Sequence, residues 1–137
     1  MARLILDTGV LVAGARHVLD PTAITDEDDV ALPAVALAEY LSGLLLDGDQ
    51  ARNAVQRAFL DDVLATVPVE DYTPAVAEHH AALMAHVRRS GSPRGAHDLI
   101  IAATARATNR TLVTTDERPR FGDLPGVDVR LARVRRR

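Results

Sequence analysis

Short apolar runs alternate with segments of helical periodicity along nearly the whole chain, and this alternation is what most constrains the fold. The runs that predict strands are residues 3–6, 30–32, 67–69, 111–114 and 127–131. The segments that predict helices are residues 8–15, 33–46, 50–66, 73–89 and 97–109. Strands that alternate with helices form a parallel sheet with helices on both faces. We therefore expect a three-layer α/β fold around a mainly parallel, twisted sheet of four or five strands.

The length of the chain fits one domain. Its 137 residues can bury about two-thirds of the unfolded surface, so a single core suffices. We expect one domain over residues 1–131 and an arginine-rich tail over 132–137. No apolar run reaches the roughly 18 residues of a membrane span, and the N-terminus is too short for a signal peptide. The expected location is therefore the cytoplasm.

Two missing residue types exclude several kinds of chemistry. The absence of cysteine excludes disulfides, thiolate nucleophiles and iron–sulfur clusters. All sixteen basic residues are arginines, so Schiff bases, Walker-type phosphate loops and receiver domains, which require lysine, are excluded as well. A haloacid-dehalogenase-type phosphatase needs Asp-x-Asp after its first strand, whereas this chain has Asp7-Thr8-Gly9. The net charge is −3, so any nucleic-acid binding must come from local patches.

Four carboxylates stand where such a fold would bring them together. Asp7 follows the first predicted strand, and Asp116 comes just after the strand at 111–114. If these strands are neighbours, both side chains lie at the same carboxyl edge, where parallel sheets bind ligands. Asp98 lies in the first turn of the helix that leads into the strand at 111–114, where the positive end of the helix favours a carboxylate. Glu39 lies in the middle of its helix.

A cluster of this kind needs a counter-charge. Two like charges about 4 Å apart repel by about 4 kcal/mol at an effective dielectric near 20. Raised pKa values or a bound cation relieve this repulsion. Hard divalent ions with oxygen ligands, Mg²⁺ or Mn²⁺, suit such a cluster best and support hydrolysis of a phosphodiester.

Each acid also has a simpler interpretation. Asp7 could only cap the first helix, Asp98 could be an ordinary acid at a helix start, and Asp116 could be a turn residue. Glu39 shares a helix face with Ser42 and Gly43, so a solvated stripe explains it equally well. The prediction of a site rests on the joint placement of the four.

Some basic residues are candidates for contacts with a polyanion. Arg94 lies in the loop before Asp98 and could bind a phosphate, and His97 could lie at the rim of the crevice. The arginine tail could also hold RNA, or could be disordered. His79 and His86 could share a helix face, but a solvated surface explains them better than a zinc site.

The sequence resembles the PIN-domain ribonucleases, and specifically the VapC-like toxins of toxin–antitoxin pairs. The resemblance is carried by LILDTGVLVA, PAVALAEYLSGL, AHDLIIAATARATNRTLVTTD and FGDLPGVDVRL. It implies a PIN-like fold, a Mg²⁺ or Mn²⁺ centre and endonucleolytic cleavage of RNA. The residues that match the family's site are Asp7, Asp98 and Asp116 as metal ligands, Glu39 as the fourth catalytic acid, and Thr8 and Thr114 as supporting residues. A further family acid is missing, because Arg120 precedes Phe121; we expect one metal, and a second only with substrate bound.

The resemblance also implies partners and a cellular role. A VapB-like antitoxin is expected to block the site, and homodimers, heterotetramers or larger complexes are expected. Apolar residues of the helices around 34–46 and 50–66 could form such a dimer, or could be buried in the monomer. The expected role is a toxin that cleaves cellular RNA and inhibits translation and growth. The alternative is an inactive PIN-like domain that only binds RNA or a partner, and the RNA target stays open.

Overall fold

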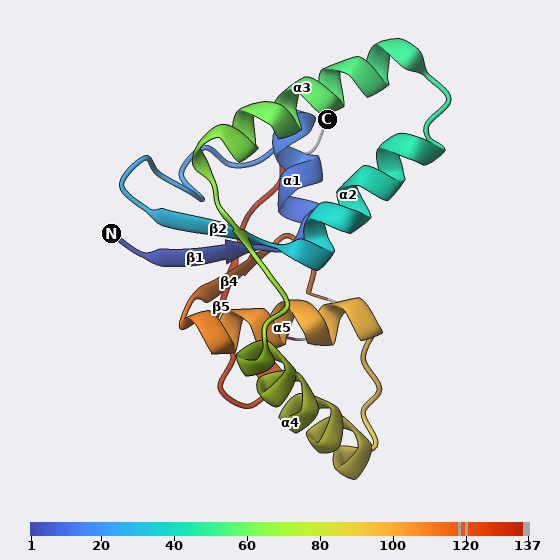
Figure 1. Cartoon of the computed structure of the whole chain (residues 1–137). Coiled ribbons are helices and arrows are strands. Elements are labelled where there is room, and N and C mark those ends of the chain that lie inside the picture. Colours follow the sequence, from blue (N-terminus) through green and yellow to red (C-terminus); the bar gives the residue numbers. More distant parts are fainter. Residues whose placement is uncertain (118, 120, 136–137) are drawn as a thin grey trace.

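The computed structural model describes residues 1–117, 119 and 121–135 (Figure 1). The strands in this part of the chain are β1 (Arg3–Leu6), β2 (Asp29–Pro33), β3 (Val69–Glu70), β4 (Thr111–Thr114) and β5 (Val129–Leu131). The α-helices are α1 (Thr8–Ala15), α2 (Ala34–Leu46), α3 (Gln50–Thr66), α4 (Pro74–Ser90) and α5 (Ala96–Thr108), and a 3₁₀ turn covers Phe121–Asp123. The predicted alternation of strands and helices is confirmed.

All pairs of neighbouring strands in the sheet are parallel. The strand order is β3-β2-β1-β4-β5, so β1 lies at the centre, between β2 and β4. Helices α1, α2 and α3 gather on one side of the sheet, and α4 and α5 lie on the other (Figure 1). This arrangement confirms the expected α/β fold with helices on both faces.

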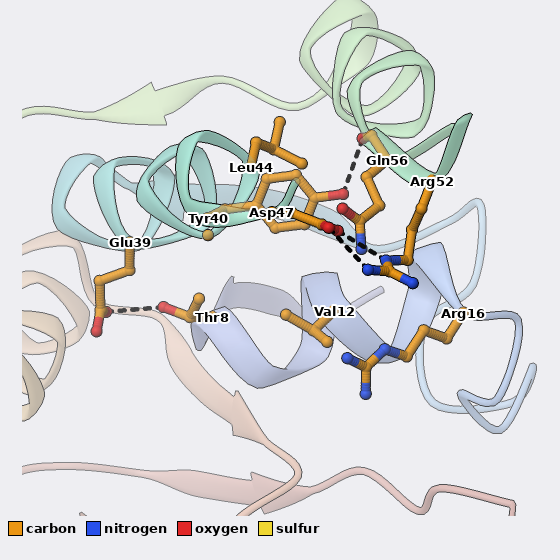
Figure 2. A pocket seen from close by; sticks show the side chains of 10 residues that line it. Thr8, Val12, Arg16, Glu39, Tyr40, Leu44, Asp47, Arg52 and Gln56 are labelled. Carbon is orange, nitrogen blue, oxygen red and sulfur yellow. Dashed lines mark hydrogen bonds and ion pairs between the residues drawn. The ribbon is translucent and has the colours of Figure 1, made fainter. Parts of the chain in front are cut away.

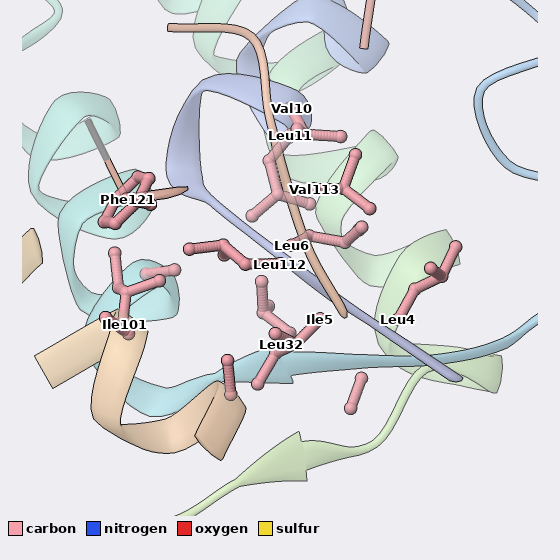
Figure 3. Packing of buried hydrophobic residues seen from close by; sticks show 14 of the residues in the cluster. Leu4, Ile5, Leu6, Val10, Leu11, Leu32, Ile101, Leu112, Val113 and Phe121 are labelled. Carbon is pink, nitrogen blue, oxygen red and sulfur yellow. The ribbon is translucent and has the colours of Figure 1, made fainter. Parts of the chain in front are cut away.

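The core forms around the central strands. Leu4 and Ile5 of β1 and Leu112 of β4 are fully buried, because helices cover both faces of the sheet. Ile101 of α5 and Phe121 of the 3₁₀ turn pack into the same cluster (Figure 3). The core therefore fixes β1 and β4 side by side, and their carboxyl ends with them.

Several predicted boundaries shift in the structure. Pro33 does not begin the helix but ends β2 and caps α2 with an extended backbone, which its fixed φ allows. The strand expected at 67–69 is Val69–Glu70, and the one expected at 127–131 is Val129–Leu131. The second is shorter because Gly126 turns the chain with a φ of 74°.

The end of the chain continues along the body of the domain. Ala132 is buried and donates its N–H to the carbonyl of Thr114, 2.8 Å away. Arg135 donates its backbone N–H to Val18, and its guanidinium to the carbonyl of His17. The last two arginines of the predicted tail, residues 136–137, lie outside the described residues.

No helix in the described part of the chain is both long and apolar enough to cross a membrane.

Candidate active site

Asp7 is fixed at the junction of β1 and α1. It is 8% exposed and caps α1: its Oδ1 accepts the backbone N–H of Thr8 at 2.8 Å. Its Oδ2 accepts the hydroxyl of Thr114 at 2.8 Å. The capping interpretation is therefore correct for one oxygen, while the other oxygen is held by a neighbouring strand.

Asp116 is brought next to Asp7 by the register of the sheet. Leu6 of β1 pairs with Val113 of β4, so the residues that follow the two strands leave the sheet at the same edge. The hydroxyl oxygen of Thr114 accepts the backbone N–H of Asp116 at 3.1 Å while donating to Asp7. One buried hydroxyl thus connects the turn that carries Asp116 to the carboxylate of Asp7.

Glu39 faces the site from α2. Its Oε1 accepts the hydroxyl of Thr8 at 2.8 Å (Figure 2). Its Oε2 lies 3.4 Å from Nδ1 of His97, and its side chain is 35% exposed. The solvated-stripe interpretation of Glu39 does not hold, because the side chain is held by two residues from other elements.

Asp98 approaches from the first turn of α5, as predicted. Its carboxylate folds back over Gly95, where a Cβ would stand only 2.9 Å from Oδ2. Glycine at this position therefore leaves the space that the carboxylate occupies.

The four acids line one hollow of about 500 Å³. Thr8, Gly9, Thr115 and Pro119 complete its walls. Each acid comes from a different part of the fold: the end of β1, the middle of α2, the start of α5 and the turn after β4. The structure therefore brings together the four carboxylates that the sequence singled out.

The electrostatics of the hollow disfavour four free charges. Burial raises the pKa of Asp7, and the nearby Glu39 and Asp116 raise it further, while the hydrogen bonds from Thr114 and Thr8 oppose them. Burial also raises the pKa of Asp98, and the charges of Asp7, Glu39 and Asp116 add to this effect. Both raised pKa values indicate a site that is stabilised when it takes up a cation or a proton.

The PIN-domain family model matches residues 4–126 of the chain. The chain belongs to the PIN-domain family. This match spans all the elements that carry the four acids.

Individual relatives of this PIN domain point to VapC proteins. The tRNA(fMet)-specific endonuclease VapC of Shigella flexneri is 25% identical over 123 residues, which cover 86% of this chain and 89% of that protein. Ribonuclease VapC of Rickettsia bellii is 25% identical over 126 residues, or 92% of this chain and 93% of that protein.

Solved structures agree with this relationship. VapBC-5 of Mycobacterium tuberculosis, a member of the VapBC family of toxin–antitoxin systems, matches with a TM-score of 0.78 and 30% identity, covering 98% of this chain and 100% of that one. VapBC2 of Rickettsia felis, bound to a promoter DNA fragment, has a TM-score of 0.81 at 22% identity, over 94% and 98% of the two chains. The PIN domain described here is VapC-like.

The donor set of this PIN domain fits a hard divalent cation. Carboxylate oxygens are the ligands that Mg²⁺ prefers, and Mg²⁺ commonly binds through one or two of them and keeps several waters. Among the described residues, no three His, Asp or Glu side chains stand close enough to hold an ion in their present positions. The arrangement therefore fits an ion held through part of the cluster, with water completing its shell.

Two predicted substrate contacts lie outside the hollow. The Nη1 of Arg94 donates to the carbonyl of Ser92 at 2.9 Å, so this guanidinium folds onto its own loop. His97 is 60% exposed and reaches Glu39 rather than the space between the acids. Arg120, where the family's further acid is missing, lies outside the described residues.

Sequence reasoning missed three residues of the hollow, Gly9, Thr115 and Pro119. A Cβ on Gly9 would stand 2.6 Å from Oγ1 of Thr115, so the first turn of α1 lies directly against the turn after β4. The available signal for Thr115 was its place directly after Thr114, the last residue of β4, because successive residues of an extended segment point to opposite sides.

Proposed function

We propose that this protein is a metal-dependent endoribonuclease that acts as the toxin of a toxin–antitoxin pair. The observation that carries the proposal is the convergence of four carboxylates from four separate elements on one hollow. Raised pKa values at Asp7 and Asp98 support it, because they mark a site built to receive positive charge.

The proposed roles follow from the resemblance of these four acids to the site of the PIN-domain family. Asp7 and Asp98 are the main metal ligands, Asp116 is the third, and Glu39 completes the catalytic acids. Thr8 and Thr114 are positioning residues, since each donates a hydroxyl hydrogen bond to one of these acids. A bound Mg²⁺ or Mn²⁺ would supply charge neutralisation at the phosphodiester and lower the pKa of an attacking water. One ion is proposed for the free protein, and a second only with substrate.

The relatives support RNA as the substrate class. One is named as an endonuclease specific for tRNA(fMet) and another as a ribonuclease. At 25% identity the substrate of a relative does not define the RNA target here. Arg94, His97 and the arginines after residue 131 are proposed as outer contacts to the RNA backbone.

A VapB-like antitoxin and a second copy of the chain are the proposed partners. Similar folds were solved as toxin–antitoxin complexes, including VapBC-5 and the DNA-bound VapBC of Salmonella typhimurium. Burial in the monomer does not account for the apolar residues at the α2–α3 end, because Leu45 and Leu46 are 87% and 85% exposed and Val55 is 59% exposed. We propose that these three side chains form the homodimer contact.

Metal titration with thermal melting tests the site. Millimolar Mg²⁺ or Mn²⁺ should raise the melting temperature of the wild type, since an ion that binds only the folded state stabilises it. Asp7→Asn should abolish this rise. Asp62→Asn, at an exposed acid of α3, is the matched control and should keep it. Equal melting curves with and without metal would contradict the metal site.

RNA cleavage is tested by mapping 5′ ends after induced expression without antitoxin. The wild type should arrest growth and create new 5′ ends, and Asp98→Ala should do neither. Equal toxicity of Asp98→Ala would show that the site assignment is wrong. Metal binding without any RNA cleavage by the wild type would instead indicate a binding domain that has lost its activity.

A further inference from the structure

A second hollow, of about 390 Å³, opens directly beside the acid hollow (Figure 2). The two share Thr8 and Glu39, whose hydrogen bond therefore forms the wall between them. Helices α1, α2 and α3 supply its lining, so it lies on the side of the site away from α5. Its volume is within the range of small-molecule sites.

The polar side of this hollow carries both donors and acceptors. Arg52 holds Asp47 through two contacts of 2.7 Å, from Nε and Nη2 to the two carboxylate oxygens. This pairing lowers the pKa of Asp47 to about 2, so the acid stays charged at neutral pH. Gln56 adds an amide, which can donate and accept, beside this ion pair (Figure 2).

Apolar side chains of α1 and α2 complete the lining of the hollow. Tyr40 and Leu44 of α2 are 5% and 6% exposed, and Val12 of α1 faces them (Figure 2). The hydroxyl of Tyr40 donates to the backbone carbonyl of Gln56 at 2.8 Å, which ties α2 to α3 across the hollow. A flat ligand would therefore meet a fixed apolar wall and a fixed polar rim.

We propose that this hollow binds the nucleobase next to the scissile phosphate and reads its hydrogen-bonding edge, an inference that rests on the proposed ribonuclease function. The lining contains two arginines, Arg16 and Arg52, and two acids, Asp47 and Glu39, so its formal charges balance. A hollow without net charge suits a neutral base better than a phosphate. Single-stranded RNA is read by bases that leave the stack and present their edges to protein donors and acceptors.

The position of the hollow favours RNA over a protein segment as its occupant. A phosphodiester held at the four acids has its neighbouring nucleotide within reach of Thr8 and Glu39, which line both spaces. The ion pair and amide on its rim also offer the polar pattern that distinguishes one base from another. The hollow would then select the cleavage sequence, while the acids cut without regard to it.

Gly43 allows the hollow to be filled without changing the acids. It lies on α2 at the lining, and a Cβ added there meets no other atom within 4 Å. Gly43→Leu therefore introduces a side chain into the space, and it also improves the helix propensity of α2. Ser42→Leu, at the exposed neighbouring position outside the lining, is the matched control.

The test uses short synthetic RNAs spanning a cleavage site mapped for the wild type, each with one nucleotide made abasic in turn. For the wild type and Ser42→Leu, one abasic position adjacent to the cut should slow single-turnover cleavage about tenfold, as expected for the loss of one well-read base. Gly43→Leu should lose this dependence. Gln56→Leu, which keeps the backbone carbonyl that Tyr40 binds, should weaken it at the same position.

The outcomes separate this inference from the proposed function. If the wild type cleaves no RNA, the ribonuclease proposal itself fails. If it cleaves but Gly43→Leu keeps the same abasic profile and the same cut sites, the base-reading hollow is overturned. Loss of antitoxin affinity in Gly43→Leu with an unchanged profile would also overturn it and assign the hollow to the partner protein. An unchanged Mn²⁺-induced rise in melting temperature verifies that each variant keeps the acid hollow.

Discussion

The carboxylate of Asp7 is balanced between opposing influences. Burial and the neighbouring acids raise its pKa, and the hydrogen bonds from Thr114 and Thr8 lower it. The Thr114 hydroxyl is the contact that can be removed most cleanly, because Thr114 is 2% exposed and valine has nearly its shape. This hydroxyl therefore helps Asp7 to lose its proton when a metal binds.

Thr114→Val should raise the pKa of Asp7 further and weaken metal binding on the order of tenfold, the usual effect of removing a partner of a metal ligand. As the pH falls, the metal-induced rise in melting temperature disappears, because Asp7 must lose its proton before it binds the metal. In Thr114→Val this loss, the acidic limb of the curve, should occur at higher pH. Melting curves over a pH series with Mn²⁺ measure both effects. Thr104→Val, at another buried threonine outside the site, should leave the limb in place; a shared shift would exclude a specific role for Thr114.

At this scale the sequence predicts residues that follow from local order and misses those that depend on distant contacts. Asp7 and Asp116 are predictable because Asp7 directly follows β1, Asp116 comes two residues after the end of β4, and the two strands pair. The orientation of Glu39 is not predictable from helical periodicity, because Thr8, which holds it, is 31 residues away in the chain. Family resemblance alone indicated its role.

Helices α1 and α3 are in close contact at a glycine. A Cβ on Gly14 would stand 2.7 Å from Cζ of Phe59, whereas one on Gly43 of α2 would meet nothing. Both glycines lie inside helices, so alanine gains up to about 1 kcal/mol of helix propensity at either position. Only Gly14→Ala also crowds the neighbouring helix, at a cost of about 1–3 kcal/mol.

The free energy of unfolding of Gly14→Ala should therefore lie about 1–3 kcal/mol below that of Gly43→Ala. Urea denaturation of the two variants and the wild type measures this difference, and the shared gain in propensity cancels. Equal stabilisation of both variants would mean that Phe59 turns aside without cost and that α1 and α3 are not closely packed there.

The elements themselves were largely predictable, because long periodic segments and buried apolar runs dominate the chain. The weakest predictions were the short strands β3 and β5. β3 has two residues and pairs only with the end of β2, so its position depends on that partner rather than on its own sequence. Val127 was included in the last strand for its apolar character, but it is buried two residues before β5 begins.

The whole molecule places two charge clusters at opposite ends of its central strands. At the amino ends, Arg110 is 8% exposed; its Nη1 donates to the carbonyl of Leu4 in β1 at 3.2 Å and to Oδ1 of Asp29 in β2 at 3.1 Å. At the carboxyl ends lie the four acids, with no arginine in the lining that the structure describes. The sequence could not show this division, since it depends on strand order. An arginine of the fold neutralises the first cluster, and we propose that the second receives a cation.

This imbalance predicts how the metal-free protein responds to pH. Asp7 and Asp98 have folded-state pKa values above 3.8, so the folded state takes up their protons first as the pH falls. Their contribution to stability is complete below pH 3.8 and is lost as the pH rises through the folded values. Asp47, with a pKa of about 2, behaves oppositely: it stabilises above 3.8 and loses this effect only as the pH approaches 2.

Asp7→Asn should therefore melt a few degrees above the wild type at pH 7 without metal, because it removes a buried charge from the cluster and asparagine caps α1 as well as aspartate does. This advantage should shrink as the pH falls, because the wild type then takes up protons at Asp7 and Asp98. Asp47→Asn should show the reverse, with a melting temperature below the wild type that persists through pH 4. Saturating Mn²⁺ should invert the first comparison, since only the wild type gains from the ion. If Asp7→Asn is less stable than the wild type at pH 7 in the absence of metal, the four acids do not repel one another and the site has no electrostatic need for a cation.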